Sequence, residues 1–350
     1  MLSHTPPVFQ TGRVAWQTSG YPRVKRKAMK ALHKRLLTLF GLVFLALLPF
    51  IIRNVYFLHL LIYASMYSIL GMGFSMMWKN RLISCGQAGF WAVGAYTSAL
   101  LVTKTGISFW LAMPIAGLAS ALFAFLIFVP ALRAGPLVFF GMSLVSSFIV
   151  MEVLGTTEFF GGWEGLMDIP SPTIGSFTFF SKTSYYYLVL ALLLVNIAVF
   201  YALYKSRIGR AWTAIGSSVR LAEAQGINVY RYRLAAAVIA CFFAGVCGAF
   251  YAHYQNLLVP NTFSFLLSIY VQMYALIGGL GFFIAGPIVG AGIMVFLPES
   301  LRVAEQLQPI FFAILIILIV IFLPGGILSI PHRIRGLADK FAMIGKASKE

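Results

Sequence analysis

Charged residues are scarce in this chain, and acidic residues are the scarcest. Only 10% of the 350 residues are Asp, Glu, Lys or Arg, and nine are acidic, whereas 60% are hydrophobic and the mean hydropathy is +0.90. A water-soluble domain could not cover its surface with this composition, so soluble enzymes and soluble binding modules are excluded. We predict an all-α polytopic membrane protein.

Motifs for catalysis and metal binding are also missing. No G-x-x-x-x-G-K-[ST] loop occurs, so the chain has no recognisable ATPase site, and no catalytic cluster supports a membrane-embedded enzyme. The three cysteines lie in apolar stretches and the five histidines are scattered, which predicts no disulfide framework, metal site or cofactor. The formal charge of +17 comes without any nucleic-acid-binding module, so we expect no nucleic acid partner.

Long apolar runs are what the sequence has in abundance. About 20 helical residues cross a bilayer core of about 30 Å, and on this measure we place ten spans. They are 36–52, 55–78, 82–102, 109–132, 137–154, 185–204, 234–255, 263–277, 286–297 and 309–323. The two shortest can also be read as re-entrant or broken helices.

The distribution of positive charge predicts the orientation, because cytoplasmic loops and tails carry an excess of Lys and Arg. With the N-terminus inside, 22 of the 26 Lys and Arg fall on the inner side, and six of the nine acidic residues fall on the outer side or at outer helix ends. We therefore predict a basic cytoplasmic tail at 1–35, a transmembrane domain at 36–330 and a second basic cytoplasmic tail at 331–350. No small-residue cleavage signal follows the first span, so the N-terminal tail is expected to be retained.

Two polar connections stand out. The stretch 205–233 carries six Lys and Arg with the single acid Glu223, and a Ser before and Gly226 after predict a short helix within it. On charge pattern alone it is a solvated loop. The outer connection 156–184 is rich in Gly, Pro and aromatic residues, which favours turns; it is either a lid or docking face, or an interfacial anchor.

Polar residues and glycines inside the spans are the remaining candidates. Polar side chains are costly in a membrane and mark a translocation pathway, although hydrogen bonds between helices explain each one as well. The pathway candidates are Gln87, Tyr96, Ser143, Ser146, Ser147, Glu152 and Gln272. Glycines allow close helix packing, which is favoured over a pathway role. The packing candidates are Gly86, Gly94, Gly245, Gly248, Gly279, Gly281, Gly286 and Gly290.

Three blocks of residues carry a family resemblance that covers most of 70–326. The first is Ser206-Arg207, Gly209-Arg210-Ala211, Ala222-Glu223-Ala224, Gly226-Ile227-Asn228-Val229 and Arg231-Tyr232-Arg233-Leu234; the second is Gly86, Ala88, Phe90 and Gly94-Ala95-Tyr96; the third is Gly278-Gly279, Gly281, Gly286-Pro287, Gly290-Ala291 and Pro298-Glu299. These blocks resemble the membrane subunits of ABC importers for branched-chain amino acids, in particular the longer, M-type permease.

The resemblance implies a permease subunit of the bacterial inner membrane that hydrolyses no ATP itself. Its expected partners are a second homologous permease, two ATP-binding subunits and an extracytoplasmic solute-binding protein. A short coupling helix would lie at about 217–225 and dock onto an ATP-binding subunit. The residues implied for this coupling are Arg210, Ser217, Ser218, Arg220, Ala222, Glu223, Ala224 and Gly226, with Ala222 and Ala224 expected to allow close docking.

One departure from the family concerns the ATPase contact. The chain has Gly216-Ser217-Ser218-Val219 where the family usually carries a charged run, which implies either an ATP-binding subunit matched to it or weaker coupling. Urea, short amides and aromatic acids are alternative solutes of the same architecture. An ion-coupled secondary transporter is the alternative class, although it is expected to show inverted repeats and midplane carboxylates.

Overall fold

The computed structural model describes residues 54–300 except 176, the segment 325–330, and the isolated residues 49, 314, 317, 318 and 321. The predicted spans 36–52 and 309–323 and both predicted tails lie outside the described residues, apart from those isolated positions. The other eight predicted spans each overlap one helix over most of its length. The described part of the chain is therefore predominantly helical, as expected for a polytopic membrane protein.

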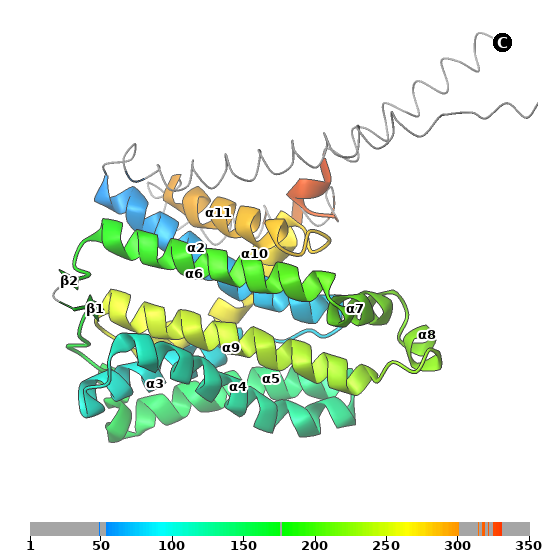
Figure 1. Ribbon diagram of the computed structural model, residues 1–350, viewed down its shortest axis with the longest axis horizontal. Helices are drawn as coiled ribbons and strands as arrows, with labels where there is room; N and C mark the ends of the chain where they lie inside the picture. The colour runs from blue at the N-terminus through cyan, green and yellow to red at the C-terminus, as the bar shows by residue number, and fades with distance from the viewer. Residues whose placement is uncertain are drawn as a thin grey trace, which may run out of the picture. The chain divides into compact units, whose positions relative to one another are not determined.

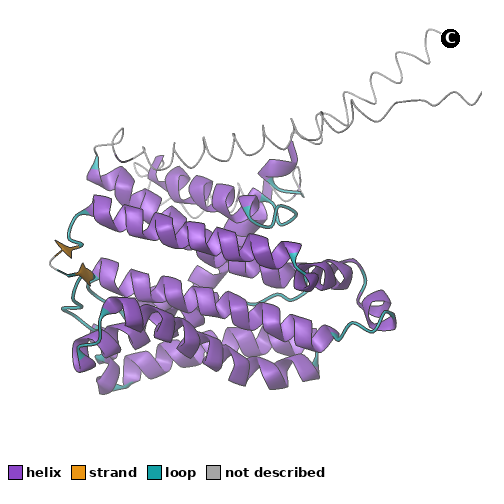
Figure 2. Cartoon of the chain, viewed as in Figure 1, coloured by secondary structure: helices purple, strands orange, loops and turns teal. Residues whose placement is uncertain are grey.

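Ten α-helices and two short strands make up most of the 54–300 region (Figures 1 and 2). In chain order they are α2 (Val55–Lys79), α3 (Gln87–Thr105), α4 (Phe109–Ala134), α5 (Pro136–Thr156), β1 (Thr173–Ile174), β2 (Phe177–Thr178), α6 (Lys182–Lys205), α7 (Arg207–Ser217), α8 (Val219–Ala224), α9 (Val229–Gln255) and α10 (Phe265–Gly278). Helix α11 (Ala285–Ser300) follows, and short 3₁₀ turns lie at Glu158–Phe160, Gly162–Glu164, Pro260–Phe263 and Ile327–Ser329.

Five of these helices are long and apolar enough to cross a membrane. They are α2, α4, α5, α6 and α9, while α10 and the apolar part of α11, Ala285–Leu297, are shorter. Side-chain caps begin several of them: Asn54 accepts a hydrogen bond from the Tyr56 amide, and Asn228 accepts one from the Arg231 amide. The chain is thus a multi-pass membrane protein by the length and composition of its helices.

Helix α9 forms the centre of the described helices and packs against α2, α3 and α4 (Figure 1). The backbones of α3 and α9 meet directly, because a side chain at Gly94 would collide with the carbonyl of Gly245, and one at Gly248 would collide with the carbonyl of Trp91. Small residues allow this close approach in the absence of a hydrophobic driving force between helices. Gly281 differs from the other packing candidates, since nothing lies within 4 Å of the place where its side chain would begin.

Two predicted boundaries were wrong. Helix α3 begins at Gln87 instead of 82, because the turn after α2 puts Arg81 in a left-handed conformation (φ 56°) and residues 82–86 are not helical. Helix α9 begins at Val229 instead of 234, since the Asn228 cap starts it inside the polar stretch. Arg231 and Arg233 therefore belong to the first turns of α9.

A candidate coupling site at one end of the helices

Helices α7 and α8 occupy the predicted polar stretch, and they lie at the end of the helices opposite to β1 and β2 (Figure 1). Each begins at a serine cap: Ser206 accepts from the Ile208 amide at 3.1 Å, and Ser218 accepts from the Leu221 amide at 3.4 Å. Gly226, with φ 78°, ends α8 by donating to the Glu223 carbonyl at 2.9 Å, and Ile227 donates to the Ala222 carbonyl at 3.0 Å. This paired closure is the Schellman motif, which favours glycine at the left-handed position.

A small apolar core attaches α7 and α8 to α9. Ile215, Ala222 and Val229 are buried together, one from each helix, and four partly buried residues pack around them: Ala214, Val219, Ile227 and Tyr232. The indole nitrogen of Trp212 also donates to the Tyr232 carbonyl at 3.0 Å. The three elements are therefore joined by side-chain packing as well as by the chain itself.

Helix α8 has one buried residue and an exposed outward face. Ala222, which the resemblance implies for docking, is buried in the small core, and its contact with another subunit stays a prediction. The exposed residues of α8 are Arg220, Leu221, Glu223 and Ala224, and Leu221 is 63% exposed. Leu221 was missed at the sequence level; a large apolar residue in a six-residue polar helix was the available signal.

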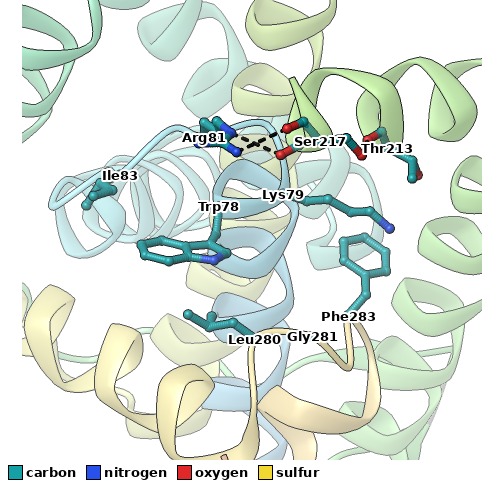
Figure 3. Close-up of a pocket in the computed structure, with 10 residues that line it drawn as sticks. Trp78, Lys79, Arg81, Ile83, Thr213, Ser217, Leu280, Gly281 and Phe283 are labelled. Carbon is teal, nitrogen blue, oxygen red and sulfur yellow. Dashed lines mark hydrogen bonds between the residues drawn. The ribbon is translucent and has the colours of Figure 1, made fainter. Parts of the chain in front are cut away.

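Arg81 connects α7 to the turn between α2 and α3 (Figure 3). Its Nε donates to the Gly216 carbonyl at 2.9 Å, and its Nη2 donates to the Ser217 carbonyl at 3.3 Å. The guanidinium therefore binds two carbonyls at the C-terminus of α7, where the helix dipole favours a cation. In the same turn the Asn80 carbonyl accepts from Nε of Arg233 at 3.1 Å, which connects the turn to α9 as well.

The start of α3 is held by side chains of α5 and α10. The amides of Cys85 and Gly89 donate to the hydroxyls of Ser143 (3.0 Å) and Ser147 (3.3 Å), and the amide of Ala88 donates to Ser268 (2.9 Å). Gln272 donates to the Ser84 carbonyl at 3.2 Å. The N-terminal amides of a helix have no partner within it, and here neighbouring helices supply the acceptors. Ser268 was not among the sequence candidates.

The family model described as "Branched-chain amino acid transport system / permease component" matches residues 56–323 of this chain. The chain belongs to this family of ABC-transporter permeases. We refer to it below as the permease.

Curated relatives agree with this assignment. The permease is 31% identical to the high-affinity branched-chain amino acid transport system permease protein LivM of Salmonella typhimurium and 32% identical to that of Escherichia coli, with 75% of this chain and 67% of each relative covered. It is also 28% identical to the nucleoside ABC transporter permease protein NupC of Lactococcus lactis, over 55% of this chain and 66% of that protein. No solved structure matches the permease.

Five of the seven pathway candidates gather around the start of α3. They are Gln87, Ser143, Ser146, Ser147 and Gln272, and Ser146 joins the group by donating to the Ser143 carbonyl at 2.7 Å. Gln87 is fully buried, and neither its amide nitrogen nor its amide oxygen has a hydrogen-bond partner among the described residues. The serine hydroxyls have structural partners, whereas the Gln87 amide has none among the described residues.

Tyr96 and Glu152 do not join this group. The Tyr96 hydroxyl donates to the Leu258 carbonyl at 3.2 Å near the far end of α3, and Glu152 is exposed near the end of α5. At the same far end, His253 is buried between the Ser98 hydroxyl (3.0 Å) and the Pro170 carbonyl (2.7 Å), which secures the 156–184 connection. Among the described residues, no group of three or more His, Cys, Asp or Glu could hold a metal ion.

Proposed function

We propose that the permease is a transmembrane subunit of an ABC importer that moves branched-chain or related amino acids across a bacterial inner membrane. Separate ATP-binding subunits supply the energy, a second homologous permease completes the membrane core, and an extracytoplasmic binding protein delivers the solute. The permease itself hydrolyses no ATP. In this proposal both termini and the α7–α8 end face the cytoplasm, in accordance with the charge distribution in the sequence.

The observation that carries the proposal is the two-sided character of α8. Its inward residue Ala222 is buried against α7 and α9, while Leu221 is exposed beside Arg220 and Glu223. Because this leucine stands between two charges on a polar helix outside the spans, it has the composition of a small interface core with a charged rim. We assign Leu221 as the apolar anchor for an ATP-binding subunit and the flanking charges as the polar rim.

Movement of α8 has a direct route into the membrane helices. Because α7, α8 and α9 share the small core, a displacement of α8 carries α7 with it. Arg81 then transmits the displacement to the α2–α3 turn through its bonds to the carbonyls of Gly216 and Ser217. The turn leads within six residues to the start of α3, which α5 and α10 hold by hydrogen bonds.

We propose that displacement of the start of α3 changes the contact between the permease and the solute. The buried side-chain amide of Gln87 has a nitrogen that can donate and an oxygen that can accept a hydrogen bond. Neither atom has a partner among the described residues. A zwitterionic amino acid offers both an acceptor and a donor, so it matches this group in transit. The relatives named for branched-chain amino acids support this solute class, while the relative named for nucleosides marks the main competitor.

Replacing Leu221 tests the coupling role without disturbing the small core. We expect Leu221→Glu to lower co-purification with the ATP-binding subunits by at least about tenfold, because truncating a central apolar anchor typically removes 1–2 kcal/mol or more and a buried charge adds to the loss. The matched control is Leu257→Glu, which places the same charge on another exposed leucine (41% exposed) beyond the end of α9. Ala222→Arg is unsuitable because it would disrupt the core.

Two results would contradict the proposal. Unchanged association and ATPase stimulation in the Leu221 variant would leave α8 as a solvated helix. Transport of solute by the purified permease alone, without ATP-binding subunits, would replace the importer with a secondary transporter.

A further inference from the structure

A cavity of about 570 Å³ lies between the end of α2, helix α7 and the turn that joins α10 to α11 (Figure 3). This volume falls in the range of small-molecule sites. The described residues of its wall include the cations Lys79 and Arg81 and the hydroxyl residues Thr213 and Ser217, and none of them is acidic. Neither the proposed solute pathway at Gln87 nor the outward face of α8 uses this space.

The two cations are not neutralised by carboxylates of the described residues. The ammonium of Lys79 lies 3.8 Å from the ring centre of Tyr204 and 5.8 Å from that of Phe283. The guanidinium of Arg81 uses Nε and Nη2 for the carbonyls of α7, and its Nη1 has no hydrogen bond to a described residue. Two positive residues in the wall of one cavity create a potential that favours an anionic ligand.

The rest of the wall is apolar. Trp78 and Ile83 are each exposed by about two-fifths (40% and 42%), and Figure 3 shows the Trp78 indole facing Leu280 of the α10–α11 turn. Trp78 and Lys79 are the last two residues of α2, which is long and apolar enough to cross a membrane. In the orientation proposed above, on which this inference rests, the cavity lies where a span reaches the cytoplasmic headgroup level at which tryptophan is common.

We propose that this cavity binds an anionic phospholipid. The chemistry that the site recognises is a phosphate, held by Lys79 and Nη1 of Arg81, and the apolar wall of Trp78 and Leu280 accepts the beginning of an acyl chain. Basic pockets between transmembrane helices at the cytoplasmic side are typical sites for such headgroups. A lipid seated here contacts the α2–α3 turn and the α10–α11 turn together, so it fastens both to α7.

The test uses the purified full chain in detergent and native mass spectrometry with phosphatidylglycerol or phosphatidylcholine. We expect retained phosphatidylglycerol on the native chain and about fivefold less on Lys79→Gln, which corresponds to about 1 kcal/mol for one basic residue near a headgroup. Lys104→Gln is the matched control, because its ammonium also lies over an aromatic ring, 3.4 Å from the ring centre of Phe159, but at the far end of α3. This control should retain the lipid.

Inorganic phosphate distinguishes a lipid from a free ion. If phosphate at millimolar concentration displaces phosphatidylglycerol completely, and Trp78→Ala retains the lipid as well as the native chain does, the site binds free phosphate and the lipid proposal is wrong. Equal retention in the Lys79 and Lys104 variants would also overturn it. Should Lys79→Gln fail to fold by circular dichroism, Leu280→Asp replaces it, since an acid in the same wall repels the phosphate and must lower retention.

Discussion

Arg81→Gly gives the sharpest test of the link between α7 and the α2–α3 turn. The change removes two hydrogen bonds from a charged donor, each worth about 1 kcal/mol net at a partly exposed site. About 2 kcal/mol corresponds to roughly a 30-fold shift toward a turn detached from α7. We therefore expect solute transported per ATP hydrolysed to fall at least about tenfold in the reconstituted complex.

Glycine is the informative replacement because Arg81 has a left-handed backbone. That conformation costs a residue with a side chain about 1 kcal/mol, and glycine adopts it freely while losing a similar amount of chain entropy on folding. These two backbone terms offset each other, so any fall in the thermal unfolding midpoint should reflect only the two lost hydrogen bonds. Arg81→Lys keeps the charge but loses the planar fork that reaches two carbonyls, so it should give an intermediate ratio of transport to hydrolysis.

Two outcomes would refute this reasoning. Transport per ATP that equals the native value would show that the turn follows α7 without Arg81. A parallel fall of ATPase activity, transport and unfolding temperature would show that Arg81 only supports the fold.

Three further changes probe other parts of the permease. Gly226→Ala should destabilise the end of α8 by about 1 kcal/mol and lower ATPase stimulation, measured with the native ATP-binding subunits, because its φ of 78° is unfavourable for alanine; an unchanged stimulation would speak against a role for the helix end. Gly248→Leu should lose about 3 kcal/mol or fail to accumulate, since its side chain would meet the Trp91 carbonyl, and normal yield in membranes would contradict this. Gln87→Leu should raise thermal stability by about 1 kcal/mol while lowering uptake, because it removes a buried unsatisfied amide; equal uptake would remove Gln87 from the pathway.

The sequence predicts where the helices of this permease lie along the chain far better than it predicts which side of each helix is buried. Apolar runs locate eight described helices because lipid accepts only such segments. The same runs do not indicate which side of a short helix is buried, so the burial of Ala222 and the exposure of Leu221 could not be predicted. Burial of Ala222 depends on Ile215 and Val229, which come from two other helices and are brought to it only by the fold.

The pathway candidates show the same limit. Serines in the apolar run of α5 were recognisable as costly in a membrane, but their partners are amides of α3, 58 residues earlier in the chain. Arg81 could not be assigned either, because a cation after a span predicts only an inner side. Its bonds to α7 cross 135 and 136 residues.

The meeting of α3 and α9 at Gly94 and Gly245 restricts the transport cycle. Sliding one helix past the other by a single residue would bring the methyl group of Ala95 or Ala244 into a slot that holds only hydrogen. The two helices are therefore expected to travel together as one body, with hinges in the connections around them. Alternation between inward-open and outward-open states is then expected to involve helices such as α5 and α10, which contact the start of α3 through a few side-chain hydrogen bonds that can break.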